Sequence, residues 1–471
     1  MIATTDRSSF LQSATDNRQP TTGGLAIYSV RPLAAFDSLP GPNTRHTHSH
    51  HGSMVMNSSP PPILRLEPTL RTDSMASSAW VGMDALRAWA AVAVVVLHAS
   101  VPYAHPSMPG LDWSVKDTPS DVMTTLFWSI EVVIMPIFLV IAGFFAARSM
   151  SRSGALSTMK GRLRRWGTPL LWATILLIPI ELYIWLLGWL AEGHITPRKL
   201  LSLKLDPHRS ANLWGLSHLW FLQYIMTYVV ILSLVWKRLN RLSIAKLQSR
   251  VLPLVVLAGV AMLTVHPEVV WGFQHSFLPV FSKWFYSGLF FAGGAIWWRC
   301  DPHLHTLTRQ GDRLLAVSGL FWIASVGFGI WYLNQTSTGV VVRASLALVT
   351  VAAAIGLTYA LIGTSLRHVV RLNPITQRLA SSSLMIYLVH HPVVGLAHIT
   401  AKYAAAEVPV WLKVVIVSAL GIAVGVGVDH LVACHRKRQR SSKQERDQQI
   451  LTIRVPESGS HPADAFDRRA A

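Results

Sequence analysis

The chain has 471 residues, of which 51% are hydrophobic and only 14% are charged, and its mean hydropathy is +0.37. This composition excludes a set of soluble domains, because long apolar runs recur from about residue 80 to residue 434. Each run is long enough to cross a hydrocarbon core of about 30 Å. The net charge of +19 does not indicate nucleic-acid binding, because the basic residues lie in short clusters between apolar runs. We predict an all-α, polytopic membrane protein without a nucleic-acid partner.

The two ends of the chain differ from its middle. Residues 1–76 are rich in Ser, Thr, Pro, Asn and His and lack the features of a cleavable signal peptide, so we predict a disordered cytoplasmic tail. The HTHSHH run at 46–51 has no fixed geometry, and we predict no specific metal site. Residues 435–471 are predicted to be a charged cytoplasmic tail, which leaves residues 77–434 as the membrane domain.

Ten transmembrane helices are predicted. They cover about 80–102, 121–147, 167–190, 217–236, 251–269, 277–298, 313–333, 339–363, 380–400 and 409–433. Most basic residues follow the even-numbered helices, as in KGRLRR at 160–165 and HRKRQR at 435–440. The positive-inside rule therefore places both termini in the cytoplasm, and we expect a multi-pass protein of the cell (inner) membrane. Cys300 and Cys434 both fall on the cytoplasmic side, where no disulfide is expected.

The first predicted helix carries two ionisable residues, Arg87 and His98. At about 100° per residue their separation is close to three full turns, so they share one helix face about 16 Å apart along the axis. Asp84 lies one turn before Arg87 and can pair with it. Ionisable residues within a membrane span are costly and mark sites by default. The alternative is that Arg87 is a snorkelling anchor and His98 a polar packing group.

Other helices carry polar residues at comparable depth. These are Glu131, Glu181, His218, His390 and His391. Pro392 also breaks the helix hydrogen bonding beside the two adjacent histidines, which is tolerated only next to protein or a wet cavity. Together these residues favour a polar chamber that opens to the outer side of the membrane.

A cytoplasmic basic cluster contains Arg162 and Arg165, which are spaced i, i+3. On a helix, this spacing presents two guanidinium groups to one ligand, and a phosphate-bearing ligand fits them. The alternative is that the cluster is ordinary inside-positive flanking sequence.

These motifs together resemble the acyltransferase-3 family of integral membrane acyltransferases. LRAWAAVAVVVLH (86–98) is similar to the Arg-x10-His first helix of the family, and RLRR (162–165) is similar to its Arg-x-x-Arg motif. MPIFLVIAGFF (135–145), HLWFL (218–222) and YLVHHPVV (387–394) resemble the glucan biosynthesis branch. The chain departs from the pattern at Ala142, where a serine is common, and at Ile134, where a polar residue is expected.

The resemblance implies a cytoplasmic acyl-CoA donor as co-substrate, no bound cofactor, and a glycan acceptor on the opposite side. It makes His98 the catalytic base with Arg87 its partner, and it assigns Arg162 and Arg165 to the acyl donor. His218, His390 and His391 match motif positions without settled individual roles. The acyl group is expected to be acetyl or succinyl.

The chemistry of the residues agrees with acyl transfer. A sugar hydroxyl needs a base to react at neutral pH, and histidine is suited to that role. No serine or cysteine is obviously placed to carry an acyl-enzyme, so direct transfer or an acyl-histidine is favoured. The alternatives are a transporter or flippase for a glycan or acylated small molecule, whose path the polar residues would line, and a receptor or scaffold.

Overall fold

The protein is described here by a computed structural model that defines residues 80–453. The whole of the predicted tail 1–76, including the 46–51 run, and residues 454–471 therefore lie outside the described residues. Within 80–453 every regular element is helical, in the order α2 (Val81–Ser100), α3 (Asp121–Ser153), α4 (Ala155–Ala191), α5 (Pro197–Ser202), α6 (Pro207–Leu213), α7 (Trp220–Arg241), α8 (Ile244–Lys246), α9 (Leu252–Val265), α10 (Glu268–Trp271), α11 (Phe281–Cys300), α12 (His305–Leu333), α13 (Val340–His368), α14 (Pro374–Ala404) and α15 (Val410–Ile453). The remaining helical elements are two short 3-10 turns, at Val101–Tyr103 and Ser217–Leu219, and a π-helical turn at Leu247–Val251.

The prediction of a polytopic all-α membrane protein is confirmed. Nine helical stretches within residues 80–453 are long and apolar enough to cross a membrane, and each overlaps a predicted span. The remaining predicted span corresponds to α11, which has 20 residues. At one end Tyr224 of α7 bonds the backbone of Val280. At the other end Arg299 donates to the carbonyl oxygens of Asn240, in the last turn of α7, and of Leu242, which directly follows the helix. Helix α11 therefore runs alongside α7 over its whole length.

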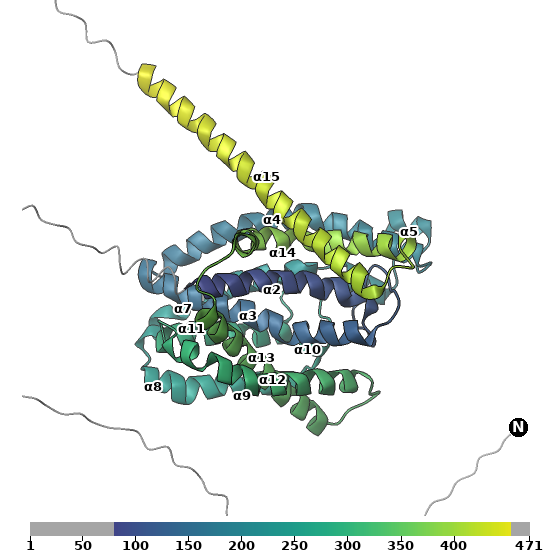
Figure 1. Ribbon diagram of the computed structural model, residues 1–471, viewed down its shortest axis with the longest axis horizontal. Coiled ribbons are helices and arrows are strands. Elements are labelled where there is room, and N and C mark those ends of the chain that lie inside the picture. Colours follow the sequence, from purple (N-terminus) through teal and green to yellow (C-terminus); the bar gives the residue numbers. More distant parts are fainter. Residues whose placement is uncertain (1–79, 454–471) are drawn as a thin grey trace, which may run out of the picture. The chain divides into compact units, whose positions relative to one another are not determined.

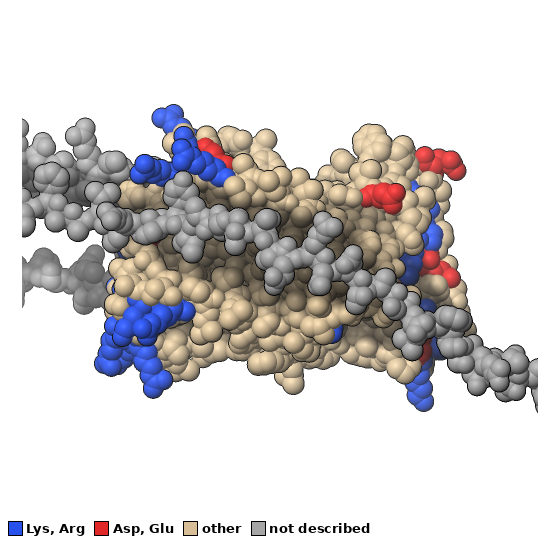
Figure 2. All heavy atoms as spheres, turned by 90° about the horizontal axis from the view of Figure 1, so that it is seen from below, with Lys and Arg blue, Asp and Glu red and all other residues tan. Residues whose placement is uncertain are grey.

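Charged residues gather at the two ends of the helices. Figure 2 shows one face, on which Lys and Arg cluster at one end, acidic and basic residues mix at the other, and a largely uncharged band lies between. The basic end is the one at which α8 lies in Figure 1, and α5 and α10 lie at the opposite end. This separation is what a membrane requires, because charged side chains are costly in hydrocarbon.

Helix α2 lies inside the bundle, where it packs against α3, α13, α14 and α15 (Figure 1). Helix α3 approaches α11 very closely: a Cβ at Gly143 would lie 2.0 Å from the Phe291 carbonyl oxygen, and one at Gly294 would lie 2.1 Å from that of Val140. Small residues allow such close approach between membrane helices. The two ionisable residues of α2 are therefore held among neighbouring helices.

The last helix extends further than predicted. The sequence predicts a span that ends near residue 433 and a polar tail after it, whereas α15 continues without a break to Ile453. Figure 1 shows it projecting past the ends of the other helices. The residues after Cys434 favour helix because they are mostly Arg, Lys, Gln and Glu, which have high helix propensity.

Candidate active site

A cavity of about 880 Å³ opens between α2, α3, α4, α7 and α14; we call it the arginine cavity. Arg87, Ala91 and Val94 line it at helical spacing along one face of α2. The predicted face is thus confirmed, and so is the pairing of Arg87 with Asp84, whose carboxylate lies 3.2 Å from the guanidinium. Arg87 also donates to the Ala380 carbonyl at 3.5 Å, which ties this end of α2 to α14.

Two further arginines enter the arginine cavity from α4. Arg162 and Arg165 both line it, as their spacing predicts. They lie within the helix because α4 begins immediately after Gly154, whose φ of 81° makes the sharp turn from α3. Glycine adopts this left-handed conformation without strain. Hydroxyl groups line the same end of the cavity, from Ser149, Ser153, Ser157 and Thr158.

A smaller cavity of about 100 Å³ lies further along α2; we call it the histidine chamber. His98, His218 and His391 line it, and so does Glu131. Residues of two loops form part of its wall, namely Met108, Leu111, Asp112 and Trp113 before α3 and Gly272, Phe273 and His275 between α10 and α11. The predicted polar chamber is present, at the end of the bundle opposite the basic cluster.

The arginine cavity and the histidine chamber adjoin each other. Val94, Met135 and Tyr387 line both of them. Val94 lies one helical turn from His98 on the same face of α2. The face of α2 that runs from Arg87 to His98, which we call the α2 stripe, therefore lines first the arginine cavity and then the histidine chamber.

His98 is held by His390. The Nδ1 atom of His98 lies 3.0 Å from Nε2 of His390, whose own Nδ1 lies 2.9 Å from the Ile386 carbonyl oxygen. A carbonyl only accepts, so Nδ1 of His390 donates, and a neutral His390 must accept at Nε2. His98 therefore donates from Nδ1, which leaves the lone pair of its Nε2 available. His390 is fully buried, whereas His98 is partly exposed to the chamber.

Glu181 is the centre of a second group. Its carboxylate lies 3.1 Å from Nδ1 of His391 and 3.5 Å from Nδ1 of His218, and it accepts a hydrogen bond from Ser217. The Ser217 hydroxyl also lies 3.5 Å from Nδ1 of each histidine. Three elements that are far apart in sequence thus converge on one buried carboxylate.

Pro392 sets the orientation of His218. Proline has no N–H, so the Leu388 carbonyl oxygen, four residues earlier in α14, loses its helical donor. Nε2 of His218 lies 3.0 Å from that oxygen and donates to it. Neighbouring side chains re-satisfy backbone groups freed by proline in this way. Nδ1 of His218 is consequently the atom that faces Glu181.

Tryptophans form the apolar walls of the chamber. His391 stacks on Trp185 with the ring centroids 5.0 Å apart and the planes at 10°. The Trp113 ring lies nearly parallel to His98 at 6.1 Å, and its Nε1 donates to Nδ1 of His398 at 3.0 Å. These contacts fix the ring planes of His391 and His98.

Glu181, His218 and His391 are also the described residues whose ligand atoms, all within 4.8 Å of one another, could hold a metal ion. However, the two imidazole rings stack at 4.7 Å with their planes only 16° apart. In-plane lone pairs of stacked rings do not converge on one tetrahedral centre. The arrangement fits a hydrogen-bonded network better than a metal site.

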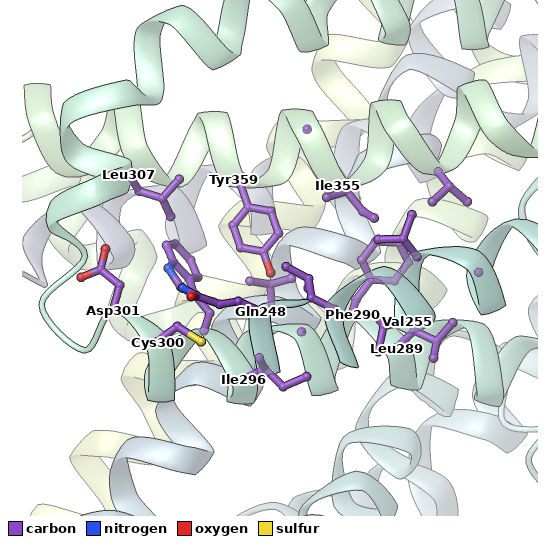
Figure 3. A pocket seen from close by; sticks show the side chains of 18 of the residues that line it. Gln248, Val255, Leu289, Phe290, Ile296, Cys300, Asp301, Leu307, Ile355 and Tyr359 are labelled. Atoms are coloured by element: carbon purple, nitrogen blue, oxygen red, sulfur yellow. The ribbon is translucent and has the colours of Figure 1, made fainter. Parts of the chain in front are cut away.

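A third cavity, of about 410 Å³, lies between α9, α11, α12 and α13 (Figure 3). Its lining is mostly apolar, with Tyr359 and Phe290 facing the space and Cys300 and Asp301 near one end. No histidine, lysine or arginine is among the residues that line it. It offers apolar surface but none of the acid–base groups found in the histidine chamber.

The structure brings together the residues that the sequence singles out. Arg87, Arg162 and Arg165 line the arginine cavity, and Glu131, His98, His218 and His391 line the chamber, with His390 directly behind His98. Sequence reasoning missed Ser217, Lys283 and His275, which also line the chamber. Ser217 directly precedes the HLWFL motif, and this position in the sequence could have indicated that it belongs to the site.

The fold is that of a polytopic helical membrane protein in which a cation-lined cavity adjoins a histidine chamber. The chain belongs to the acyltransferase-3 family, whose sequence model, described as an acyltransferase domain, matches residues 80–430. It is therefore an acyltransferase.

The chain is also similar to proteins that are named for glucan biosynthesis. The chain is 27% identical over 332 residues to glucans biosynthesis protein C of Escherichia coli K12, an alignment that covers 66% of this chain and 81% of the relative. It is 26% identical to the protein of the same name from Escherichia coli O1:K1, with the same coverage of both chains. No solved structure matches the chain.

Proposed function

We propose that this acyltransferase moves an acyl group, acetyl or succinyl, from cytoplasmic acyl-CoA to a hydroxyl of an extracytoplasmic glycan. It would act within the cell (inner) membrane and need no bound cofactor. The name of the relatives, glucans biosynthesis protein C, supports a glycan as acceptor. The observation that carries the proposal is the junction of the two cavities at Val94, Met135 and Tyr387, directly beside His98.

The arginine cavity supplies the donor site. Its volume of about 880 Å³ lies in the range of small-molecule and cofactor sites. Arg162, Arg165 and the neighbouring hydroxyl groups would bind the phosphates of CoA, because guanidinium groups form strong bidentate hydrogen bonds with phosphate. The pantetheine arm would then lie along the α2 stripe, past Arg87 and Val94, and place the thioester at the entrance of the chamber.

His98 is the proposed base. The acceptor oxygen attacks the thioester carbonyl carbon while its proton passes to Nε2 of His98, the atom that His390 leaves free. The tetrahedral intermediate collapses with cleavage of the carbon–sulfur bond, and the proton on His98 passes to the departing CoA thiolate. No acyl-enzyme is required, and His98 returns to its starting protonation state.

The Glu181–His391 pair favours a second base. A carboxylate at Nδ1 of a histidine is the arrangement that activates histidine in catalytic triads. His391 and His98 have their ring centres 4.8 Å apart, so both can reach an acceptor hydroxyl in the chamber. In this assignment His98 enters the reaction as the imidazolium, His391 takes the acceptor proton, and His98 gives its Nε2 proton to the leaving thiolate. A proton then passes from His391 to His98 and restores the starting state.

The test uses the full-length protein in membranes with labelled acetyl-CoA or succinyl-CoA and a glucan acceptor, and mass spectrometry of the product. We expect His98→Ala to lower acylation about a hundredfold or more, while an exposed control, His303→Ala, leaves it unchanged. Equal acylation by wild type and His98→Ala would contradict the assignment of His98. Movement of the glycan across the membrane without any acylated product would favour the transporter instead.

If His391 is the acceptor base, His391→Ala should lower the rate at least as much as His98→Ala. Because only His98 would then protonate the thiolate, a donor with a more acidic thiol leaving group should partly rescue His98→Ala and not His391→Ala. Rescue of neither variant would support His98 as the single base.

A further inference from the structure

Two charged side chains in the histidine chamber have no role in the acyl transfer described above. Glu131 lies on α3 and Lys283 lies near the start of α11, and both line the chamber. Neither lines the arginine cavity. They therefore lie on the chamber side of Val94, Met135 and Tyr387, the three residues at which the two cavities meet.

Each of these charges lacks a protein partner among the described residues. No ion pair within 4.0 Å and no hydrogen bond joins Glu131 to Lys283. Lys283 instead has its ammonium 4.0 Å above the Trp220 ring, a cation–π contact that leaves its N–H donors free. Charges within a membrane bundle are costly unless they face a polar partner.

His275 adds a third polar group to the same wall. It lies between α10 and α11, and its Nε2 is buried without a hydrogen-bond partner among residues 80–453. Burial lowers the pKa of His275 to about 4, so the ring is neutral at physiological pH. The ring packs directly on Gly215, where a Cβ would lie 2.1 Å from its Cδ2. Close packing thus holds a neutral donor–acceptor group at the chamber wall.

We propose that Glu131, Lys283 and His275 form the acceptor subsite and bind the hydroxyl groups of a sugar. Lys283 donates hydrogen bonds to sugar oxygens, Glu131 accepts them from sugar hydroxyls, and the neutral His275 can do either. The proposal rests on the proposed function and specifies where the acceptor binds.

The position of the three groups separates the acceptor from the donor. Lys283 is the third residue of α11, at the end of the bundle where Tyr224 bonds Val280, and His275 lies in the preceding loop. Arg162 and Arg165 lie near the opposite end, in the first turns of α4. A ligand held by Lys283 and His275 therefore approaches from the side opposite to the CoA phosphates.

The narrowness of the chamber further limits what enters. A volume of about 100 Å³ holds the reacting groups and the part of the sugar that carries the hydroxyl, so the remainder of a glycan stays in the outer loops. Phe273 lies in those loops and is half-buried, so its ring offers apolar surface to a sugar ring.

The test measures the KM for each substrate separately, with the purified full-length protein in lipid nanodiscs, acyl-CoA and a glucose oligosaccharide. We expect Lys283→Met and Glu131→Gln each to raise the KM for the oligosaccharide about tenfold or more, as for loss of hydrogen bonds from a charged group. The KM for acyl-CoA should change less than twofold. Lys283→Arg should retain part of the acceptor affinity.

Lys413→Met is the matched control, because Lys413 is another buried lysine near the same end of the bundle but pairs with Asp117 outside the chamber. It should leave both KM values unchanged. A rise in the KM for acyl-CoA in Lys283→Met, or no change in either KM, would overturn the acceptor subsite.

Binding of the oligosaccharide to His98→Ala without acyl-CoA, followed by tryptophan fluorescence, tests the subsite without turnover. Weaker binding in the double variants with Lys283→Met or Glu131→Gln supports the subsite, and unchanged binding contradicts it. The wild-type protein could also bind the oligosaccharide in a way that depends on Lys283 and yet transfer no acyl group. That result would overturn the proposed function and support the acceptor subsite.

Discussion

The arginine cavity and the histidine chamber share three wall residues but hold their polar groups in different ways. In the arginine cavity the cations lie along a wide space of about 880 Å³, and Arg162 contacts Trp166 rather than a carboxylate. In the chamber, about 100 Å³ in volume, the histidines and Glu181 are bonded to one another. The first arrangement suits a large ligand bound through its phosphates, and the second suits a reaction that requires fixed proton positions.

On the function proposed above, the donor is bound in one cavity and the chemistry takes place in the other. Substitutions in the arginine cavity should then mainly change the affinity for the donor. Substitutions of the bonded histidines and Glu181 in the chamber should mainly change the rate, because a displaced proton donor or acceptor affects the transition state more than the bound substrate. The following predictions test this division.

The largest effect is expected for Glu181, which holds Ser217, His218 and His391. We expect Glu181→Gln to lower kcat about a hundredfold or more with little change in the KM for acyl-CoA. Glu181→Ala should in addition lower the free energy of unfolding by about 3–5 kcal/mol, as when one partner of a buried ion pair is removed. Steady-state kinetics and thermal unfolding in nanodiscs measure both. If Glu181→Gln raised only the KM for acyl-CoA, the division between a donor-binding cavity and a catalytic chamber would be wrong.

The next effect is expected in the arginine cavity. Replacing Arg162 and Arg165 together by methionine should raise the KM for acyl-CoA about tenfold to a hundredfold, with kcat nearly unchanged, because charge-assisted hydrogen bonds to phosphate are lost. Arg164→Met is the control, because Arg164 is exposed on the same helix and does not line the cavity. Equal effects of the control and the double variant would show that only the local positive charge matters.

A smaller effect is expected at Pro392. The Pro392→Ala variant restores a backbone N–H that competes with His218 for the Leu388 carbonyl oxygen. We expect kcat to fall about tenfold, with the KM for acyl-CoA unchanged. The substitution His218→Gln retains a donor for the Leu388 carbonyl but removes the imidazole ring. A kcat that is identical in wild type and Pro392→Ala would contradict control of His218 by the proline.

The smallest effect is expected outside both cavities, at the Asp117–Lys413 ion pair, where Nζ lies 3.0 Å from the carboxylate. Burial alone would raise the pKa of Asp117, but the hydrogen bond and charge of Lys413 lower it below its ordinary value. The pair therefore stabilises the fold above the unfolded pKa of about 3.9, and this stability is lost as the pH falls through the folded pKa.

Asp117→Asn should accordingly lower the melting temperature at pH 7 by a few degrees and remove part of the difference in melting temperature between pH 7 and pH 3. Thermal unfolding at several pH values measures this, and acyl transfer at pH 7 should stay close to wild type. A large loss of kcat would show that the loop at Asp117 belongs to the reaction machinery.

The sequence by itself determined the membrane fold and the stripe on α2. Apolar runs long enough to cross a bilayer and the helical repeat between Arg87 and His98 depend only on local geometry, which residue spacing specifies. The same reasoning holds for Arg162 and Arg165, whose spacing on one helix places them at one cavity. His218, His390 and His391 were predicted from their depth in the spans, and the short family motifs that contain them point to the same residues.

Only the tertiary structure decided how these groups are paired. That His390 bonds His98, that Glu181 gathers Ser217 with two histidines, and that Pro392 frees a carbonyl for His218 depend on contacts between helices far apart in sequence. The same reason explains why Lys283 and His275 were not predicted. In the sequence each is a polar residue near a helix end, and only the folded loops place it at the chamber. Residue spacing fixes the face of a single helix, whereas the partner that this face meets is set by the packing of the whole bundle.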